Sequence, residues 1–314
     1  MRKIAVINQK GGVGKTTTTV NLASGLARCG LQVGIIDLDP QAHASAHLGL
    51  EPDGTRPSMY NALVENVPLA QVRQKITENL WLMGADIHLA AAEMELSGVV
   101  GREVILRVLL EKVFFFPKIF PPPVPCLLPE YAAQASEMPK PLDYLLMDCG
   151  PSLGVLTLNA LACADEVFIP LQPHYLALHG LSKLLETTSL VAKRINPRLI
   201  VSGIIICLYD AATRLSGEVI RDLESFLEKS RGVTSPWCQA QIFKTRIRRN
   251  IKLAECPSFG QSIFDYAPGS NGAEDYRLLA EEVQKQHYRI MQGRVAVDAS
   301  ESIESRLLDV MQPA

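Results

Sequence analysis

The amino-acid sequence predicts an α/β fold in which a single doubly wound, mostly parallel sheet carries helices on both faces. Three observations predict this class. Short apolar runs alternate with segments of helical periodicity along most of the chain. The first run is followed by a glycine-rich loop, a helical segment and a second apolar run, which together make a βαβ unit. The chain has 314 residues, 47% of them apolar and 20% charged, which suits one large domain with a sizeable core.

The predicted elements follow one another in regular order. Residues 3–8 form a buried strand, and Val20, Leu22 and Leu26 give the next segment the spacing of a helix that ends at Gly30. Further strands are predicted at 32–37, 80–83, 144–148, 167–170, 200–208 and 239–243. Helices are predicted at 16–29, 59–65, 87–96, 102–113, 155–163, 178–195, 216–230 and 273–289. There is no internal repeat, so we expect one domain over residues 1–290.

Two segments depart from this pattern. Residues at about 114–140 are rich in proline and phenylalanine and separate a helix from a strand, where a connection of a few residues is usual. We expect an inserted surface loop there. The alternative is a docking patch for a partner, because exposed phenylalanines are costly without a use. Residues 291–314 are expected to form a polar C-terminal tail.

Composition narrows the classes of partner and compartment. The net charge of −2 indicates neither a nucleic acid nor a membrane, so such a partner must be recognised through a local cluster. The seven cysteines include no C-x-x-C pair, which is typical of reduced thiols in a cytoplasmic protein. We find no signal-peptide pattern and no apolar stretch of about 18 residues, so we expect no membrane partner.

A glycine-rich loop follows the first strand and opens the first helix. It reads Gln9-Lys10-Gly11-Gly12-Val13-Gly14-Lys15-Thr16-Thr17. The glycines let backbone N–H groups turn toward phosphate oxygens, which also meet the positive end of the helix. Lys15 is expected to contact the β- and γ-phosphates, and the Thr16 hydroxyl to bind Mg²⁺. Residues 10–17 therefore predict a P-loop NTPase that binds and hydrolyses ATP with Mg²⁺, although Gln9 stands where the common pattern has glycine.

Two later strands end in carboxylates. Asp37 and Asp39 occupy alternate positions at the end of the second strand and therefore share one side of it. Ligands of open α/β sheets bind at this carboxyl edge, where one aspartate can support Mg²⁺ or Lys15 and the other can hold an attacking water. Asp148 ends the strand at 144–148 in the manner of a Walker B motif. We name Thr16, Asp37 and Asp148 as the residues of the metal site.

Six motifs occur in a fixed order, namely KGGVGKTTTTVNLA, DLDPQ, DCGPSLG, PLQPHYLALHGL, TRIRRNIKLAE and YAPGSNGAEDY. Over about residues 1–112 and 142–290 the chain resembles the ParA/Soj partition ATPases, within the larger group that contains MinD and the nitrogenase iron protein. The resemblance implies that Lys10 is a signature lysine, which reaches the phosphates of the other subunit in a nucleotide-sandwich homodimer. It also implies that Asp39 positions the hydrolytic water. A second cation supplied in trans would couple hydrolysis to dimerisation.

A basic cluster lies at residues 244–252. It has five basic residues in nine and no acidic one, namely Lys244, Arg246, Arg248, Arg249 and Lys252. This density suits nonspecific contact with DNA phosphates, and by the resemblance Lys252 matches a DNA-binding arginine. Another family arginine aligns near Ala212, so its contact is expected at Arg214, two residues on. By the same resemblance the segment runs close to the nucleotide base, so some of these cations can serve ATP or the dimer interface instead.

The resemblance implies an ATP-switched dimer that coats DNA nonspecifically and drives chromosome or plasmid partition. A ParB-like partner with a basic N-terminal segment would stimulate its slow hydrolysis, and the protein would be cytoplasmic and nucleoid-associated. A MinD-like ATPase on a membrane surface is one alternative, but it requires a basic amphipathic C-terminal helix where this tail is acidic. An iron–sulfur carrier is another, but of its cysteines only Cys149 is suitably placed. An ATPase that positions a protein cargo on the nucleoid is a third.

Overall fold

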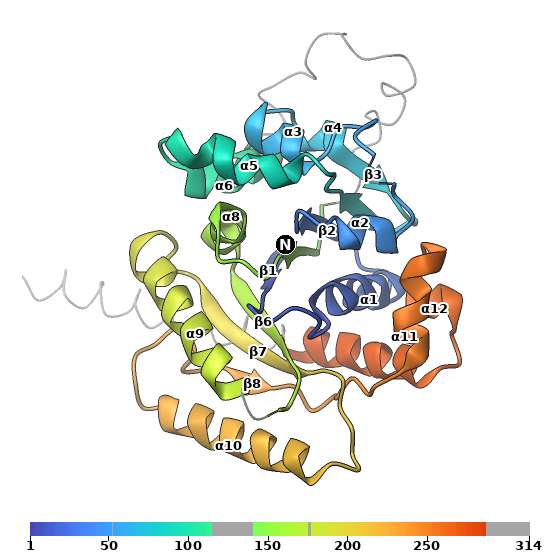
Figure 1. Cartoon of the computed structure of the whole chain (residues 1–314), viewed down its shortest axis with the longest axis vertical. Coiled ribbons are helices and arrows are strands. Elements are labelled where there is room, and N and C mark those ends of the chain that lie inside the picture. Colours follow the sequence, from blue (N-terminus) through green and yellow to red (C-terminus); the bar gives the residue numbers. More distant parts are fainter. Residues whose placement is uncertain (52, 115–140, 175–176, 287–314) are drawn as a thin grey trace, which may run out of the picture.

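The computed structural model describes residues 1–314 except 52, 115–140, 175–176 and 287–314 (Figure 1). An eight-stranded sheet has the order β3-β4-β2-β5-β1-β6-β7-β8. Neighbouring strands are parallel except for the β3–β4 pair at one edge, which is antiparallel. The predicted fold class, one doubly wound and mostly parallel sheet, is confirmed.

The strands are β1 (Arg2–Val6), β2 (Val33–Leu38), β3 (Arg73–Lys75), β4 (Leu80–Met83), β5 (Tyr144–Cys149), β6 (Glu166–Leu171), β7 (Ile200–Ile206) and β8 (Gln241–Ile242). The first half of the chain contains α1 (Lys15–Arg28), α2 (His43–His47), α3 (Met59–Val64), α4 (Leu69–Val72), α5 (Leu89–Glu95) and α6 (Ile105–Phe114). The second half contains α8 (Val155–Cys163), α9 (Ala177–Arg194), α10 (Arg214–Ser230), α11 (Ile251–Glu255), α12 (Ile263–Tyr266) and a helix over residues 271–286. Three 3-10 turns complete the list, η1 (Leu96–Gly98), η2 (Arg102–Val104) and η3 (Cys256–Phe259).

The predicted strands and long helices are all present, with ends that differ by a few residues. The segment predicted as one helix at 102–113 begins with the 3-10 turn η2 before α6 starts. The sequence pattern does not predict β3 or the short helices α2, α4, α11 and α12, because three to five residues are too few to display a period. Phe114 closes α6, and the rest of the 114–140 insertion lies outside the described residues, as does the 291–314 tail.

Both faces of the sheet are buried, which explains the continuous apolar runs of the central strands. On one face, Ala5 and Ile36 belong to a core that also includes residues of α3, α5, α6, α8 and α9. On the other face, Ile4 and Ile35 pack with residues of α1 and of helix 271–286. Figure 1 shows these two helical layers on either side of the strands. Within the described ranges, none of the helices has the length and apolar character needed to cross a membrane.

The order of the strands decides where a ligand can bind. β1 lies between β5 and β6, and the chain continues from β1 toward β2 on one side, while β7 and β8 extend the sheet on the other. A crevice forms where the direction of winding reverses, beyond the carboxyl ends of the strands. The glycine-rich loop leaves β1 at this point. In register beside it, Val6 of β1 pairs with Asp148 of β5, which in turn pairs with Asp37 of β2.

Arg2 of β1 is a buried charge that ties three elements together. Its Nε and Nη2 atoms donate to the two carboxylate oxygens of Glu166 in β6, each at 2.7 Å. Nη1 donates to the backbone oxygen of Val283 at 2.8 Å, and Nη2 donates to the side-chain oxygen of Gln286 at 2.7 Å. The bidentate geometry and these further bonds offset the cost of removing both charges from water.

We predict that Arg2→Ala lowers the free energy of unfolding by about 3 kcal/mol or more, because the variant removes the bidentate partner of the buried Glu166 carboxylate. Urea unfolding followed by circular dichroism measures the change. Lys3→Ala is the matched control, since the Lys3–Asp165 pair is partly exposed and its loss should cost less than about 1 kcal/mol. Equal losses in the two variants would contradict the role given to the buried pair.

Candidate functional site

The glycine-rich loop has the backbone of a phosphate-binding turn. Gly12 and Gly14 have φ angles of 70° and 93°, a left-handed conformation that glycine adopts without strain. Helix α1 begins at Lys15, and Gly14 at its N-cap supplies no side-chain cap to the first N–H groups. These donors and the positive end of the helix therefore point to an anion as the natural occupant.

Thr16 and Asp148, predicted from separate motifs, lie in direct contact. The Thr16 hydroxyl donates to Oδ2 of Asp148 at 2.7 Å, and the Thr19 hydroxyl donates to Oδ1 at 3.0 Å. Thr19 is a site residue that motif reasoning missed. The available signal was its spacing, because a residue three positions after Thr16 lies on the same face of the helix.

This arrangement fits a magnesium ion bound together with a nucleotide. Among the described residues there is no cluster of three or more His, Cys, Asp or Glu side chains that could hold a metal by itself. Mg²⁺ in phosphate-transfer sites usually needs only one or two protein groups, because phosphate oxygens and waters complete its octahedron. The Thr16 hydroxyl and the buried Asp148 carboxylate are oxygen ligands of this kind.

Asp37 is more heavily hydrogen-bonded within the protein than the sequence pattern indicates. Its Oδ1 accepts from the backbone N–H of Asp39 at 3.1 Å, and its Oδ2 accepts from the N–H and hydroxyl of Ser45 at 2.9 and 2.8 Å. Ser45 also accepts from the N–H of Ala85 at 2.9 Å. Asp37 therefore fastens α2 to the carboxyl ends of β2 and β4, and its assignment to the metal stays a prediction.

Burial dominates the electrostatics of the two paired aspartates. It raises the pKa of Asp148 to about 8, with a further increase from the nearby Asp37 carboxylate. Burial likewise raises the pKa of Asp37 to about 6, although the bonds from Ser45 oppose the shift. The pKa of Lys15 is lowered by burial, against the attraction of Asp148 and Asp39. A bound cation beside Asp148 would relieve this unfavourable concentration of buried carboxylates.

The two predicted catalytic lysines point in different directions. Lys15 is buried, and its ammonium group donates to the backbone oxygen of Lys10 at 3.2 Å. Lys10 is exposed, and its own ammonium group lies against Nε2 of His174, beyond the end of β6. Burial and the Lys10 charge both lower the pKa of His174, which favours the neutral imidazole. Asp39 is buried near them, with its Oδ1 accepting from the N–H of Gln41 at 3.0 Å.

A pocket of about 560 Å³ lies over the P-loop. One wall consists of the loop and the start of α1, from Gly11 to Thr17, and Asp39 lies beside it. The pocket is also lined by residues between 247 and 257, in the segment that the resemblance places close to the nucleotide base, and by Tyr276, which sequence reasoning did not predict there. The lining residues of this segment include Ile247, Arg248, Asn250, Leu253 and Pro257. The pocket thus has a polar, phosphate-binding side and a largely apolar side.

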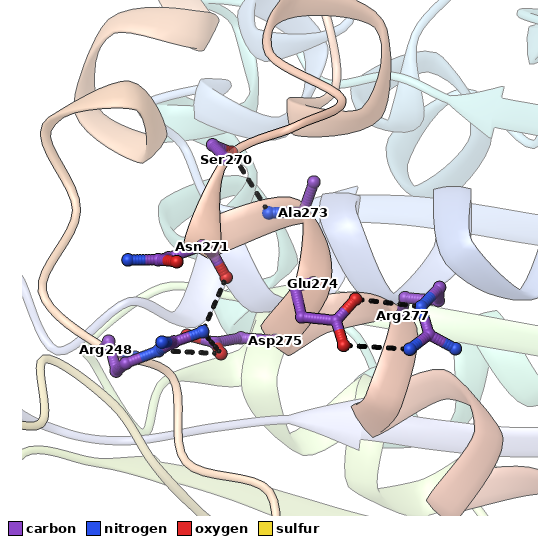
Figure 2. Close-up of polar contacts among 7 residues, drawn as sticks. All are labelled: Arg248, Ser270, Asn271, Ala273, Glu274, Asp275 and Arg277. Atoms are coloured by element: carbon purple, nitrogen blue, oxygen red, sulfur yellow. Dashed lines mark hydrogen bonds and ion pairs between the residues drawn. The ribbon is translucent and has the colours of Figure 1, made fainter.

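The predicted DNA-binding residues differ in their surroundings. Arg246 stacks on the Tyr209 ring at 4.7 Å, and Lys252 donates to Glu255 at 2.8 Å. Arg249 is exposed and gives its backbone N–H to Tyr209. Arg214, at the start of α10, is also exposed. Arg248 forms a two-pronged bond with Asp275 (Figure 2), and its assignment to DNA stays a prediction.

Comparison with known proteins agrees with this geometry. A family model described as AAA domain matches residues 1–114 and 131–201. The sporulation initiation inhibitor protein Soj of Bacillus subtilis is 40% identical over 281 residues, which cover 89% of this chain and 97% of that protein. The chain belongs to the ParA/Soj family. The chromosome partitioning protein ParA of Myxococcus xanthus is 37% identical and aligns with 90% of this chain and 88% of its own length.

Solved structures extend the comparison of this ParA/Soj protein. Cobyrinic acid a,c-diamide synthase from Mycobacterium smegmatis, solved with an ATP analog and magnesium, has a TM-score of 0.70 and 31% identity, and the match covers 92% of this chain and 96% of that one. The cell division ATPase MinD of Pyrococcus furiosus has a TM-score of 0.63 at 20% identity, a likeness of fold alone. Family and site together identify this ParA/Soj protein as an ATPase that uses ATP and Mg²⁺.

We predict that Asp148→Asn abolishes Mg²⁺-dependent ATP hydrolysis and yet removes a pH-dependent cost to stability. With the pKa of Asp148 raised by burial to about 8, the folded state retains a proton that the unfolded chain releases near pH 4. The stability contributed by this group therefore falls as the pH rises from about 4 to about 8, and asparagine cannot show that fall. Urea unfolding of the nucleotide-free protein at pH 5, 6, 7 and 8 measures it.

Asp222→Asn on the exposed side of α10 is the control for this prediction, and it should leave the pH dependence as it is. If Asp148→Asn has the same pH profile as the wild-type protein, the buried carboxylate does not titrate as we describe. If the variant retains Mg²⁺-dependent hydrolysis, the metal is held elsewhere.

Proposed function

We propose that this ATPase is a partition switch. Two copies close around two ATP molecules, the dimer binds DNA of any sequence, and hydrolysis returns it to the monomer. The observation that carries the proposal is the direction of Lys10, whose exposed ammonium group lies against His174 while Lys15 is buried in the loop. The exposure of Lys10 supports a role on the nucleotide of a second subunit.

The remaining loop residues provide one complete set of contacts within a subunit. The backbone N–H groups and Lys15 would hold the phosphates, and Thr16 with Asp148 would hold Mg²⁺, whose charge would offset that of the phosphate oxygens. Asp39, buried beside the pocket, orients the attacking water. Lys10 from the partner then adds positive charge where the transition state gains negative charge. In this scheme hydrolysis is possible only in the dimer.

The surface around residues 246–252 is the proposed DNA face. Arg246, Arg249 and Lys252 supply its charge, and Arg214 at the start of α10 extends it. Salt-dependent contact with phosphates needs charge density rather than base-reading geometry, so this face would not select a sequence. Binding of this kind would place the protein on the nucleoid.

The relatives named as partition proteins support a role in moving a chromosome or plasmid. We infer that a ParB-like protein with a basic N-terminal segment stimulates hydrolysis. ATP selects the dimeric state, and the partner shortens its lifetime, which is a shift of populations between two quaternary states.

For the DNA face, we predict that Arg246→Glu, Arg249→Glu and Lys252→Glu together remove ATP-dependent DNA binding while ATP binding is retained. The triple variant replaces three cations that can neutralise phosphates with three charges that repel them. Fluorescence anisotropy with a labelled duplex at several salt concentrations measures affinity and its salt dependence. A control with the same change in charge is Arg221→Glu, Lys229→Glu and Arg231→Glu, on and just after α10. An equal loss of DNA affinity in both triple variants would mean that net charge, and not this face, determines DNA binding.

For the dimer, we predict that Lys10→Ala and Asp39→Ala fail in opposite ways. Lys10→Ala should bind ATP through Lys15 and the loop amides but not dimerise, and so lose DNA binding and hydrolysis together. Asp39→Ala should bind ATP, dimerise and stay on DNA, with hydrolysis slowed on the order of 10²-fold or more. Size-exclusion chromatography with light scattering and a DNA pull-down measure both outcomes.

A Lys10→Ala protein that dimerises with ATP as the wild type does would refute the trans role of this lysine. If Asp39→Ala hydrolyses ATP normally, the water must be oriented by another group, of which Asp37 is the nearest carboxylate in sequence.

A further inference from the structure

Arg248 and Asp275 form a fixed pair beside the nucleotide pocket. Nη2 of Arg248 donates to Oδ1 of Asp275 at 2.6 Å, and Nε donates to the same carboxylate at 3.0 and 3.1 Å. The backbone N–H of Arg248 donates to Oδ2 of Asp275 at 2.9 Å, and Nη2 also reaches the backbone oxygen of Asn271 at 3.4 Å. Figure 2 shows the guanidinium lying along the Asp275 carboxylate at the start of helix 271–286.

The two partners differ in exposure. The side chain of Asp275 is 5% exposed, whereas that of Arg248 is 45% exposed. One edge of the guanidinium is therefore fixed against a nearly buried carboxylate, and much of the rest of the side chain remains open to a ligand. A bidentate pair of this kind is stronger and more directional than a surface ion pair.

The segment that carries Arg248 is held from both sides. Tyr209, just after β7, donates its N–H to the Ile247 oxygen at 2.9 Å and accepts the N–H of Arg249 at 3.2 Å. The Asn250 side chain caps α11 by accepting from the N–H of Lys252 at 2.8 Å. Asp275 provides the third attachment, from helix 271–286. Backbone bonds to Tyr209 and the bonds to Asp275 thus connect this segment to β7 and to helix 271–286.

This segment and the P-loop line the same pocket. Among the residues that line the pocket, the lysines and arginines are Lys15 and Arg248. Lys15 lies at the phosphate end. Arg248 lines the pocket together with Leu253, Ala254 and Pro257, whose apolar side chains suit the flat face of a base.

We propose that Asp275 is a positioning residue that holds Arg248 against the nucleoside half of ATP, and that Arg248 does not belong to the DNA face. A planar guanidinium with one edge bound to a carboxylate can stack on a purine or donate to ribose hydroxyls. The Asp275 carboxylate also offsets the charge of the guanidinium, which weakens its attraction to DNA phosphates relative to an unpaired arginine. The proposal rests on ATP occupying this pocket and not on dimerisation or DNA binding.

Isothermal titration of the purified protein with ATP, ADP and inorganic tripolyphosphate tests the assignment. Arg248→Ala should weaken ATP and ADP binding about tenfold, the scale of a lost bond to a charged group, and leave tripolyphosphate binding unchanged. Arg277→Ala is the matched control. Arg277 is an exposed arginine of helix 271–286, the helix that carries Asp275. It bonds to Glu274 and Glu281 and does not line the pocket. The Arg277→Ala variant should bind all three ligands as the wild type does.

The positioning role of Asp275 is tested by a double-mutant cycle. Asp275→Asn should also weaken ATP and ADP binding, and adding it to Arg248→Ala should cost nothing further, because Asp275 acts through Arg248. If Arg248→Ala does not fold, Arg248→Gln replaces it, because the glutamine amide can still donate to Asp275. This variant should also bind ATP and ADP more weakly and bind tripolyphosphate as the wild type does.

Three results would overturn the proposal. Unchanged ATP affinity with weaker DNA binding in Arg248→Ala would return the residue to the DNA face. Equal loss of ATP and tripolyphosphate would mean that the pair only supports the pocket wall. Additive losses in the double variant would show that Asp275 acts independently of Arg248. Wild-type binding of ATP, measured in the same titrations, separates these results from a failure of the nucleotide site itself.

Discussion

The side-by-side placement of Asp37 and Asp148 is the constraint on which the site depends. The two residues are paired in register on adjacent parallel strands, and both are buried. Like charges so close in a low-dielectric interior oppose each other's ionisation. The fold resolves the conflict differently for each carboxylate. Asp37 receives bonds from Ser45 and the backbone of Asp39, whereas Asp148 receives two threonine hydroxyls from α1.

The consequence is a site that is stabilised by its ligand. Hydrogen bonds from hydroxyl groups only partly stabilise the buried charge of Asp148. A divalent cation held with phosphate oxygens would stabilise this charge further. Nucleotide and metal thereby favour one arrangement of the carboxyl edge, where Asp39 and the pocket wall also lie. In the proposed dimer, Lys10 carries this preference to a second subunit. If the proposed dimer forms, binding energy would be converted in this way into a change of quaternary state.

The sequence was sufficient for the parts of the site that motifs specify. Strand, glycine loop and helix are contiguous, so Lys15 and Thr16 could be placed from their spacing, and Asp148 from the apolar strand that precedes it. The order of elements also predicted the sheet. The strand β3 could not be predicted because its three polar residues become a strand only by pairing with β4.

Tertiary partners account for what the sequence could not resolve. Asp37 and Asp39 look equivalent at a strand end. Only the fold shows that Ser45 donates two hydrogen bonds to the Asp37 carboxylate. Arg248 looks like its basic neighbours until Asp275, 27 residues further along, is placed beside it. His174 is 164 residues from Lys10, and no local pattern connects them. Asp275 and His174 are distant in sequence from the residues they bind, where periodicity and motif spacing carry no information. Ser45 is only eight residues from Asp37, but it lies in α2, a helix too short to be predicted.

A crystal structure of the wild-type protein with a non-hydrolysable ATP analogue and Mg²⁺ tests the central claim most directly. We expect a two-fold dimer in which Lys10 has left His174 and contacts the phosphates bound to the other subunit, with the metal beside Thr16 and Asp148. A nucleotide-bound monomer, or a dimer in which Lys10 remains on His174 or contacts only its own phosphates, would contradict this expectation.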